Sequence, residues 1–259
     1  MEFDNLRKFS KELGFKAENI CTEWGQVKGS DCFDKFQQFD FFPEMDENGI
    51  VSMRFRTVNG GCNSVKITKR YTVQKNTDIF DIICKFHNNI KNSNGKMSER
   101  FLIVGNKEHP SGLITLAGLN KEEVSALMWR IIRNIEISIK KAIGPMDESM
   151  VRNALDEKRS NKLIDNYRKE VKEKLDLGLT NLLSIEEIRL LLKNRSFKLE
   201  QIPQGIKSNF TKDVVRLRNR VSHHTVERNL ITNTNEFVHL YQTMRKVEQI
   251  SMELSKIVS

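Results

Sequence analysis

Residues 112–139 read GLITLAGLNKEEVSALMWRIIRNIEISI, and the spacing of the apolar residues changes within this stretch. Up to Leu119 most of the residues are apolar and nearly consecutive, which is typical of a short buried strand. From Val124 the apolar residues recur every three or four positions, which predicts one face of a long helix. The change predicts a boundary between two structural regions near residue 120.

Strand signals lie before that boundary. The turn Asp46-Glu-Asn-Gly49 predicts a hairpin, because an Asn-Gly pair tolerates the positive φ of a tight turn. Gly14 is expected to end a first helix, and Thr77 is expected to cap a second. The expected elements are a helix at 3–13, hairpin strands at 40–45 and 50–55, a strand at 71–73, a helix from 77, and strands at 101–105 and 112–116.

The order strand, helix, strand, strand within residues 1–120 resembles a CBS-domain pair. Two stretches carry the resemblance, Tyr71-Thr-Val-Gln-Lys-Asn-Thr77 and Gly112-Leu-Ile-Thr-Leu-Ala-Gly-Leu119, and Gly49-Ile-Val-Ser52 offers a degenerate first copy. The family commonly binds adenine nucleotides or related small ligands, and it often has an Asp near the position of Gly118. The resemblance implies a regulatory module with nucleotide contacts from Thr72, Thr77 and Thr115.

Residues 121–259 show helical spacing to the end. Asn120 with Glu123 forms a predicted capping box, and Gly144-Pro145 predicts the end of the long helix. The other expected helices run over about 148–175, from the capping box Ser184-Ile-Glu-Glu187, from about 209, and over about 235–257. Five helices imply a bundle. The predicted fold class is therefore an α+β N-terminal module at 1–120 followed by an all-α helical bundle at 121–259.

The net charge of +9 is unevenly distributed. Residues 1–120 carry 17 Lys and Arg against 15 Asp and Glu, whereas residues 121–259 carry 26 against 19. The second region is therefore the one expected to meet a polyanion such as RNA.

The predicted fourth helix contains the sequence VVRLRNRVSHH at 214–224. The core stripe of that helix, at spacings of four, three and four, is Phe210, Val214, Leu217 and Val221. A separate polar stripe consists of Arg216, Asn219, Arg220 and His223. A cluster of cationic and imidazole groups of this kind is suited to phosphate.

Arg218-Asn219-Arg-Val-Ser-His223 resembles the motif of the HEPN superfamily, helical proteins that include many ribonucleases of toxin and defence systems. The family motif is an Arg, often followed by Asn, and a His after four to six intervening residues. The resemblance implies an HEPN-like domain over 121–259 and a toxin or antiviral defence role. The implied catalytic residues are Arg218, Asn219 and His223, and the implied RNA-binding residues are Arg216, Arg220 and His224.

Two other pairs satisfy the family spacing, Arg216 with His223 and Arg218 with His224. We prefer Arg218 with His223 because Asn219 follows the arginine. In a straight helix Arg218 and His223 differ by about 140° around the axis. Their convergence requires the length of the Arg side chain, a helix end or a second subunit. The resemblance implies the second subunit, since HEPN ribonucleases typically place two motif copies face to face across a homodimer.

The implied chemistry is attack of an RNA 2′-hydroxyl on the adjacent phosphate, without a metal ion or another cofactor. His223 would transfer or orient a proton, because imidazole titrates near neutrality. Arg218 would stabilise the additional negative charge, and Asn219 would position Arg218, His223 or phosphate. DNA lacks the attacking hydroxyl, so RNA is the expected substrate and a 2′,3′-cyclic phosphate the expected product end.

Two other interpretations of the same residues stay open. A noncatalytic dimeric protein could use this face to bind RNA or a nucleotide without cutting it. A scaffold could carry the arginines as a solvated basic face, with His223 favouring a helix C-terminus, where its charge meets the helix dipole. Loss of cleavage with retained binding in His223→Ala would favour the enzyme over both.

The sequence also bears on location and on cysteine chemistry. No stretch approaches 18 uninterrupted apolar residues, and the N-terminal residues lack a signal-peptide pattern, so we expect a cytoplasmic protein without a membrane segment. The cysteines lack CxxC spacing, which favours free thiols over disulfides or a zinc site. They are Cys21, Cys32, Cys62 and Cys84.

Overall fold

The computed structural model of the chain describes residues 2–23, 41–56, 62–92, 100–106, 108–173, 178–194, 202–222 and 230–258. The chain forms two compact units, and each unit is built from two separate stretches. The first unit comprises Met1–Leu127 and His224–Gln242, and the second comprises Met128–His223 and Thr243–Ser259. The first change of unit follows Leu127, whereas the apolar spacing changes near residue 120.

The first unit contains a four-stranded sheet with the strand order β1-β7-β6-β5. β5 (Thr72–Val73) and β6 (Phe101–Gly105) are parallel, and α5 (Ile79–Asn92) lies between them in the chain. β7 (Pro110–Thr115) and β1 (Thr22–Glu23) extend the sheet through antiparallel pairs. The predicted order of strand, helix, strand and strand is confirmed, while β1 was not predicted.

The cap of α5 lies one residue later than predicted. Asp78 Oδ1 accepts a hydrogen bond from the Phe80 backbone N–H at 2.8 Å, which is the geometry of an N-cap. The Thr77 carbonyl instead accepts a hydrogen bond from the Ala17 backbone N–H at 2.9 Å. The assignment of Thr77 as the cap was therefore wrong, because this residue pairs with a distant segment and the carboxylate of Asp78 is the nearer acceptor.

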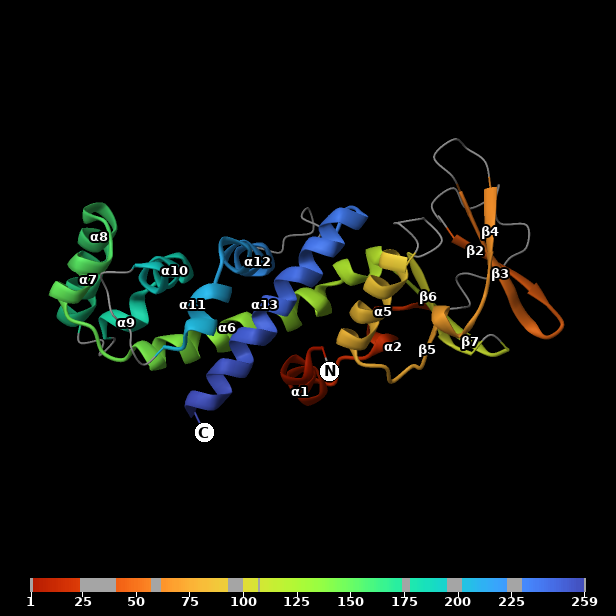
Figure 1. Cartoon of the computed structure of the whole chain (residues 1–259), viewed down its shortest axis with the longest axis horizontal. Helices are drawn as coiled ribbons and strands as arrows, with labels where there is room; N and C mark the ends of the chain where they lie inside the picture. The colour runs from red at the N-terminus through yellow and green to blue at the C-terminus, as the bar shows by residue number, and fades with distance from the viewer. Residues whose placement is uncertain are drawn as a thin grey trace. The chain divides into compact units, whose positions relative to one another are not determined.

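A second sheet of the same unit has the order β2-β3-β4 and is antiparallel throughout (Figure 1). Its strands are β2 (Phe41–Asp46), β3 (Gly49–Arg56) and β4 (Cys62–Lys66). The predicted hairpin is confirmed, and Gly49 at its turn has a φ of 114°, which a residue without a Cβ adopts without strain. The hairpin pairs with β4 rather than with the first sheet, a pairing that the sequence did not indicate.

One apolar core joins the two sheets. Phe41 of β2 lies 5.3 Å from Phe101 of β6, measured between ring centroids, and Tyr71 stacks on Phe101 at 5.1 Å. The buried members of this core are Phe41, Ile50, Met53, Phe55, Ile67, Tyr71, Phe101, Ile103 and Leu113. Burial of so many large side chains supplies the main driving force for this part of the fold.

Helices close the other side of the first unit. α1 (Asp4–Leu13) ends at Gly14, whose φ of 72° is the left-handed cap predicted from the sequence. Phe3 lies 5.6 Å from the rings of both Phe80 and Tyr241. Tyr241 belongs to α13 (Thr234–Val258), so the C-terminal stretch of the chain contributes to the packing around Phe3. The short helix α2 (Ala17–Ile20) leads into β1.

The Asn120 side chain ties the two stretches of the first unit together. Its amide nitrogen donates to the Ile231 carbonyl, and the Ile231 N–H donates to its amide oxygen, both at 2.7 Å. α6 (Glu122–Ile143) begins two residues later, so Asn120 does not cap this helix as predicted. The predicted end is confirmed, because Gly144 adopts a φ of 74° directly after α6.

The described part of the chain after residue 120 is helical, which confirms the predicted order of a mixed α and β region followed by a helical region. The expected single helix at 148–175 is two helices, because Asp156 accepts a hydrogen bond from the Arg159 N–H and starts a new one. The capping box of Ser184 with Glu187 is confirmed. The remaining helices are α7 (Glu148–Ala154), α8 (Glu157–Lys172), α9 (Leu179–Leu182), α10 (Ile185–Lys193), α11 (Gln204–Asn209) and α12 (Lys212–Ser222).

Candidate functional site

The candidate motif lies at the end of α12, in the second unit. Val214, Leu217 and Val221 are at most 7% exposed, so the predicted core stripe of this helix is confirmed. Phe210 is also buried, but it follows α11 and precedes α12. α12 packs against α10, and this contact leaves the arginines of α12 on the other positions of the helix.

The arginines of α12 differ in their surroundings. Arg216 is 77% exposed, and its guanidinium lies 4.0 Å from Asp213. Arg218 is only 27% exposed, and Arg220 is half-buried. Asn219, next to Arg218, is exposed. The fold therefore holds Arg218 in place, whereas Arg216 extends into solvent.

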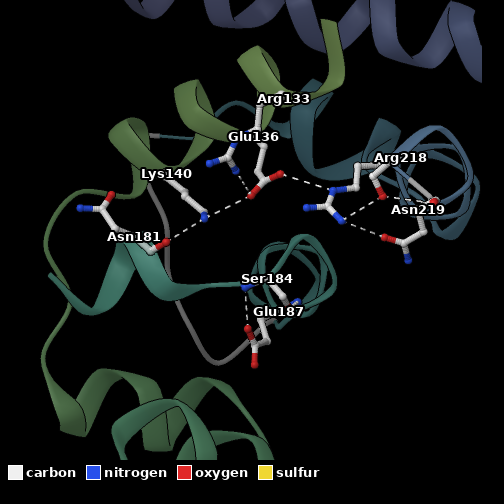
Figure 2. A network of polar contacts seen from close by, with 9 residues as sticks. Arg133, Glu136, Lys140, Asn181, Ser184, Glu187, Arg218 and Asn219 are labelled. Atoms are coloured by element: carbon white, nitrogen blue, oxygen red, sulfur yellow. Dashed lines mark hydrogen bonds and ion pairs between the residues drawn. The ribbon is translucent and has the colours of Figure 1, made fainter. Parts of the chain in front are cut away.

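Three contacts hold the Arg218 guanidinium (Figure 2). Its Nε lies 3.7 Å from Oε2 of Glu136, and its Nη1 donates to Oδ1 of Asn219 at 3.3 Å and to Oγ of Ser222 at 3.5 Å. The Ser222 hydroxyl donates in turn to the Asn219 carbonyl at 3.1 Å. The structure thus brings Asn219 against Arg218 and adds Ser222, which the sequence analysis did not include.

Glu136 of α6 is the centre of the network in Figure 2. Its Oε1 lies 2.7 Å from Arg133 Nη1 and 3.2 Å from Lys140 Nζ. Lys140 also donates to the Asn181 carbonyl at 3.0 Å. Glu136 is 2% exposed and Lys140 is 9% exposed, while Arg133 is 41% exposed. Three cations from two helices therefore surround one buried carboxylate.

Sequence reasoning missed Glu136, Arg133 and Lys140, although a signal for them exists. Glu136 falls within the apolar stripe of α6, between the buried Ile132 and Ile139. A carboxylate at a core position requires a cationic or hydrogen-bonding partner. Arg133 and Lys140 lie one turn from Glu136 on α6, so these partners were visible in the sequence. Arg218 lies on α12, which comes close to Glu136 only in the folded chain.

Within the described part of the chain, three cations meet the carboxylate of Glu136, so this network carries a net charge of +2. Among the described residues, Oε2 of Glu136 has no hydrogen-bond partner, and its nearest cation is the Nε of Arg218 at 3.7 Å. The guanidinium groups of Arg133 and Arg218 are the partly exposed members. Such an arrangement attracts anions and offers them forked N–H donors.

Ion pairs on neighbouring helices organise the flanks of the site. Lys246 of α13 lies 2.9 Å from Oδ2 of Asp213, which neutralises the acidic residue in the first turn of α12. On α10, Glu186 accepts two hydrogen bonds from Arg189, at 2.7 and 2.8 Å, and this bonding lowers the pKa of the carboxyl. Asp213 and Glu186 are each already paired with a cation, so neither carboxylate offsets the positive charge around Glu136.

His223 and His224 lie outside the described residues. The choice between the Arg–His pairs therefore rests on the sequence. What the structure adds is that Arg218, and not Arg216, is the arginine held by an internal carboxylate.

The three threonines expected to contact a nucleotide lie in the first unit. Thr72 and Thr115 flank the central strand β6, where they pair with Ile103 and Phe101. Thr72 Oγ1 donates to the Lys69 carbonyl at 3.3 Å, and all three threonines are half-buried. An added Cβ at Gly118 would lie 2.9 Å from the Ile20 carbonyl, so the backbone of α2 occupies the space beside this position.

Within the described ranges, no group of three or more His, Cys, Asp or Glu side chains could hold a metal ion. Within the same ranges, no helix combines the length and the apolar character needed to cross a bilayer. Cys21 and Cys84 are free, and burial raises the pKa of the Cys84 thiol to about 12. Cys32 and the side chain of Cys62 lie outside the described residues.

Comparison of the chain with protein-family models, with curated proteins and with solved structures gave no match.

Proposed function

We propose that this protein is a metal-independent endoribonuclease of HEPN type, acting at a composite site in a homodimer. The observation that carries the proposal is the placement of Arg218. Its guanidinium is tethered to the buried Glu136 on another helix, remains 27% exposed, and stands five positions before His223 in the chain. A held but accessible guanidinium is suited to a phosphate whose charge increases during the reaction.

The proposed reaction is an internal transfer at phosphorus. The 2′-oxygen of the RNA attacks the adjacent phosphorus, and the bond from phosphorus to the 5′-oxygen of the next nucleotide breaks. The 2′-hydroxyl loses its proton and the leaving 5′-oxygen gains one, with His223 transferring or orienting a proton. Arg218 donates hydrogen bonds to the phosphate oxygens. The products are a 2′,3′-cyclic phosphate and a 5′-hydroxyl.

The first unit is proposed to regulate this activity. Its β5-α5-β6-β7 order is the part of the fold on which the CBS-like expectation rests. The proposed regulator is an adenine nucleotide or another small ligand near Thr72, Thr77 and Thr115, and the proposed context is a toxin or antiviral defence system. A nucleotide that binds the first unit would raise the melting temperature of the protein by mass action.

The test is cleavage of an end-labelled, mixed-sequence, single-stranded RNA in EDTA. The parent protein should cut and leave cyclic phosphate ends. Arg218→Ala and His223→Ala should cut about 100- to 1000-fold more slowly, the range for loss of a preorganised charge-stabilising donor. Arg130→Ala is the matched control, since the same side chain is removed from an exposed position of α6, and its rate should stay within about threefold of the parent.

Absence of cleavage by the parent, with and without adenine nucleotides, would remove the enzyme proposal. The same cations would then favour the second candidate, a noncatalytic RNA-binding or nucleotide-binding protein, because a net charge of +2 around Glu136 attracts phosphate without any requirement for cleavage. Retained RNA binding by the parent and weaker binding by Arg218→Ala would support that second function.

A further inference from the structure

The carboxylate of Glu136 has no apparent role in apolar packing. It lies in the buried stripe of α6, at 2% exposure, among Ile132, Ile135 and Ile139. Burying a carboxylate requires compensation by cations, and replacing buried ion pairs with apolar residues is often neutral or stabilising. The presence of Glu136 is therefore better explained by what it does to the cations around it.

The two oxygens of Glu136 face different helices. Oε1 meets Arg133 and Lys140 of its own helix at 2.7 and 3.2 Å, while Oε2 lies 3.7 Å from Arg218 of α12. One carboxylate thus sets the positions of two guanidinium groups that come from different elements. Figure 2 shows Arg133 and Arg218 approaching the carboxylate from α6 and α12.

Lys140 and Arg133 differ in what they can reach. Lys140 is 9% exposed and also donates to the Asn181 carbonyl, so its ammonium is buried and bonded to groups within the second unit. Arg133 is 41% exposed and keeps donors beyond the one that meets Glu136, since a guanidinium has five N–H groups. Of the two α6 cations that meet Glu136, Arg133 is the one that a solvent-borne anion can contact.

We infer that Glu136 is a positioning residue for Arg218, and that Arg133 is the second cation of the same phosphodiester-binding site. The inference rests on the proposed function and deepens it, since it adds two residues of α6 to a site predicted from α12 alone. Glu136 keeps Arg218 directed at the reacting phosphate, and Arg133 binds an RNA phosphate beside it. Neither residue forms or breaks a bond.

The first experiment separates positioning from binding. Glu136→Gln keeps the shape of the side chain and removes its charge, so Arg218 loses its tether while the cluster becomes more positive. We expect kcat to fall about 10- to 100-fold, the effect of a small misplacement of a catalytic group. The Kd for a 2′-O-methyl RNA, which cannot be cut, should stay equal or become tighter. Glu136→Asp should restore part of kcat, because a carboxylate returns.

The second experiment tests Arg133 against a neighbour on the same helix. Arg133→Gln should weaken binding of the 2′-O-methyl RNA and lower the slope of log Kd against log salt concentration by about 0.7, the value for one phosphate contact on a single strand. Arg130→Gln removes an identical charge from an exposed position three residues earlier, and it should leave the slope unchanged. Melting temperatures of all variants are measured alongside.

The outcomes distinguish this inference from the proposed function. Active parent protein with Glu136→Gln within twofold of its kcat would overturn the positioning role, while the endoribonuclease proposal would stand. Equal salt slopes for Arg133→Gln and Arg130→Gln would overturn the phosphate contact. An inactive parent would end the enzyme proposal, and the binding measurements would still decide the phosphate site.

If Glu136→Gln does not fold, Glu136→Asp takes its place. A lower kcat than that of the parent with an unchanged Kd would support the positioning role, and an equal kcat would oppose it.

Discussion

Asp78 shows how a single buried carboxylate makes stability depend on pH. Its side chain is 7% exposed and accepts the hydrogen bond that caps α5. Burial raises the pKa of this carboxyl above its ordinary value of 3.8, against the opposing effect of hydrogen bonds and of Arg7. Between 3.8 and the raised pKa the folded protein binds more protons than the unfolded chain, so the contribution of Asp78 to stability falls as the pH rises through that interval.

Asp78→Asn should therefore gain stability relative to the parent at pH 7.5, because the amide retains the cap without the buried charge. The gain should shrink as the pH is lowered toward 3.8, where the parent carboxyl is protonated in the fold. Urea unfolding at pH 7.5 and at pH 4.5 measures the difference. Asp81→Asn is the control, and it should lose up to about 1 kcal/mol at pH 7.5 because it removes the ion pair with Arg7. A difference between parent and Asp78→Asn that is independent of pH would contradict the expectation.

The candidate site also shows what sequence reasoning can reach at the residue scale. Arg218 and Asn219 were identified because their spacing to His223 is a local pattern. Glu136 was not, since its connection to Arg218 crosses more than eighty positions and depends on the packing of two helices. Ser222 was within the quoted motif, yet its hydroxyl contact with Arg218 follows from a side-chain geometry that spacing alone does not specify.

At the scale of elements, the edge strand β1 depends on a glycine. β1 pairs with β7 at Gly112, where an added Cβ would lie 2.8 Å from the Thr22 carbonyl and 2.9 Å from Cys21 Sγ. No side chain fits these distances without movement of the β1 backbone. Gly112 belongs to the stretch that resembles a ligand-binding module in the sequence. In the fold, the close packing of β1 against β7 already requires a glycine at this position.

Gly112→Ala is expected to lower the free energy of unfolding by about 1 to 3 kcal/mol, the usual effect of forcing an atom into a filled space. Chemical denaturation measures it. Gly178→Ala serves as the comparison, because its added Cβ would meet nothing within 4 Å and its φ of −60° suits any residue. Equal stabilities for the two variants would show that β1 can withdraw from β7 without loss.

Some helix ends can be predicted from neighbouring residues in the sequence, and others cannot. Gly14, Gly144 and the capping box at Ser184 were predicted correctly, because each end is decided by residues within one turn. Asn120 has an equally good capping sequence, but its amide is bound by the backbone of Ile231. A partner more than a hundred residues away is invisible to a pattern of spacing.

At the scale of the whole molecule, the proposal requires two copies of the chain. The resemblance to HEPN ribonucleases implies that the second copy completes the site, since a straight helix would separate Arg218 and His223 by about 140° around its axis. Specific cleavage activity should therefore fall when the protein is diluted below its dimer dissociation constant. Sedimentation across the same concentrations supplies that constant. A monomer with activity proportional to protein concentration would contradict the composite site, while leaving the phosphate contacts of one subunit intact.

The first unit is assembled from the two ends of a long interval of sequence, and this has a consequence for biosynthesis. Three noncovalent contacts connect the two stretches: the rings of Phe3 and Tyr241, the rings of Phe86 and Phe237, and the hydrogen bond of Asn120 with Ile231. On the ribosome the N-terminal stretch emerges long before these partners are made. α12 is translated in the interval between them. A nascent chain therefore never carries a completed first unit before the helix with Arg218 exists, and any restraint that the first unit exerts has to wait until the chain has been made as far as Gln242.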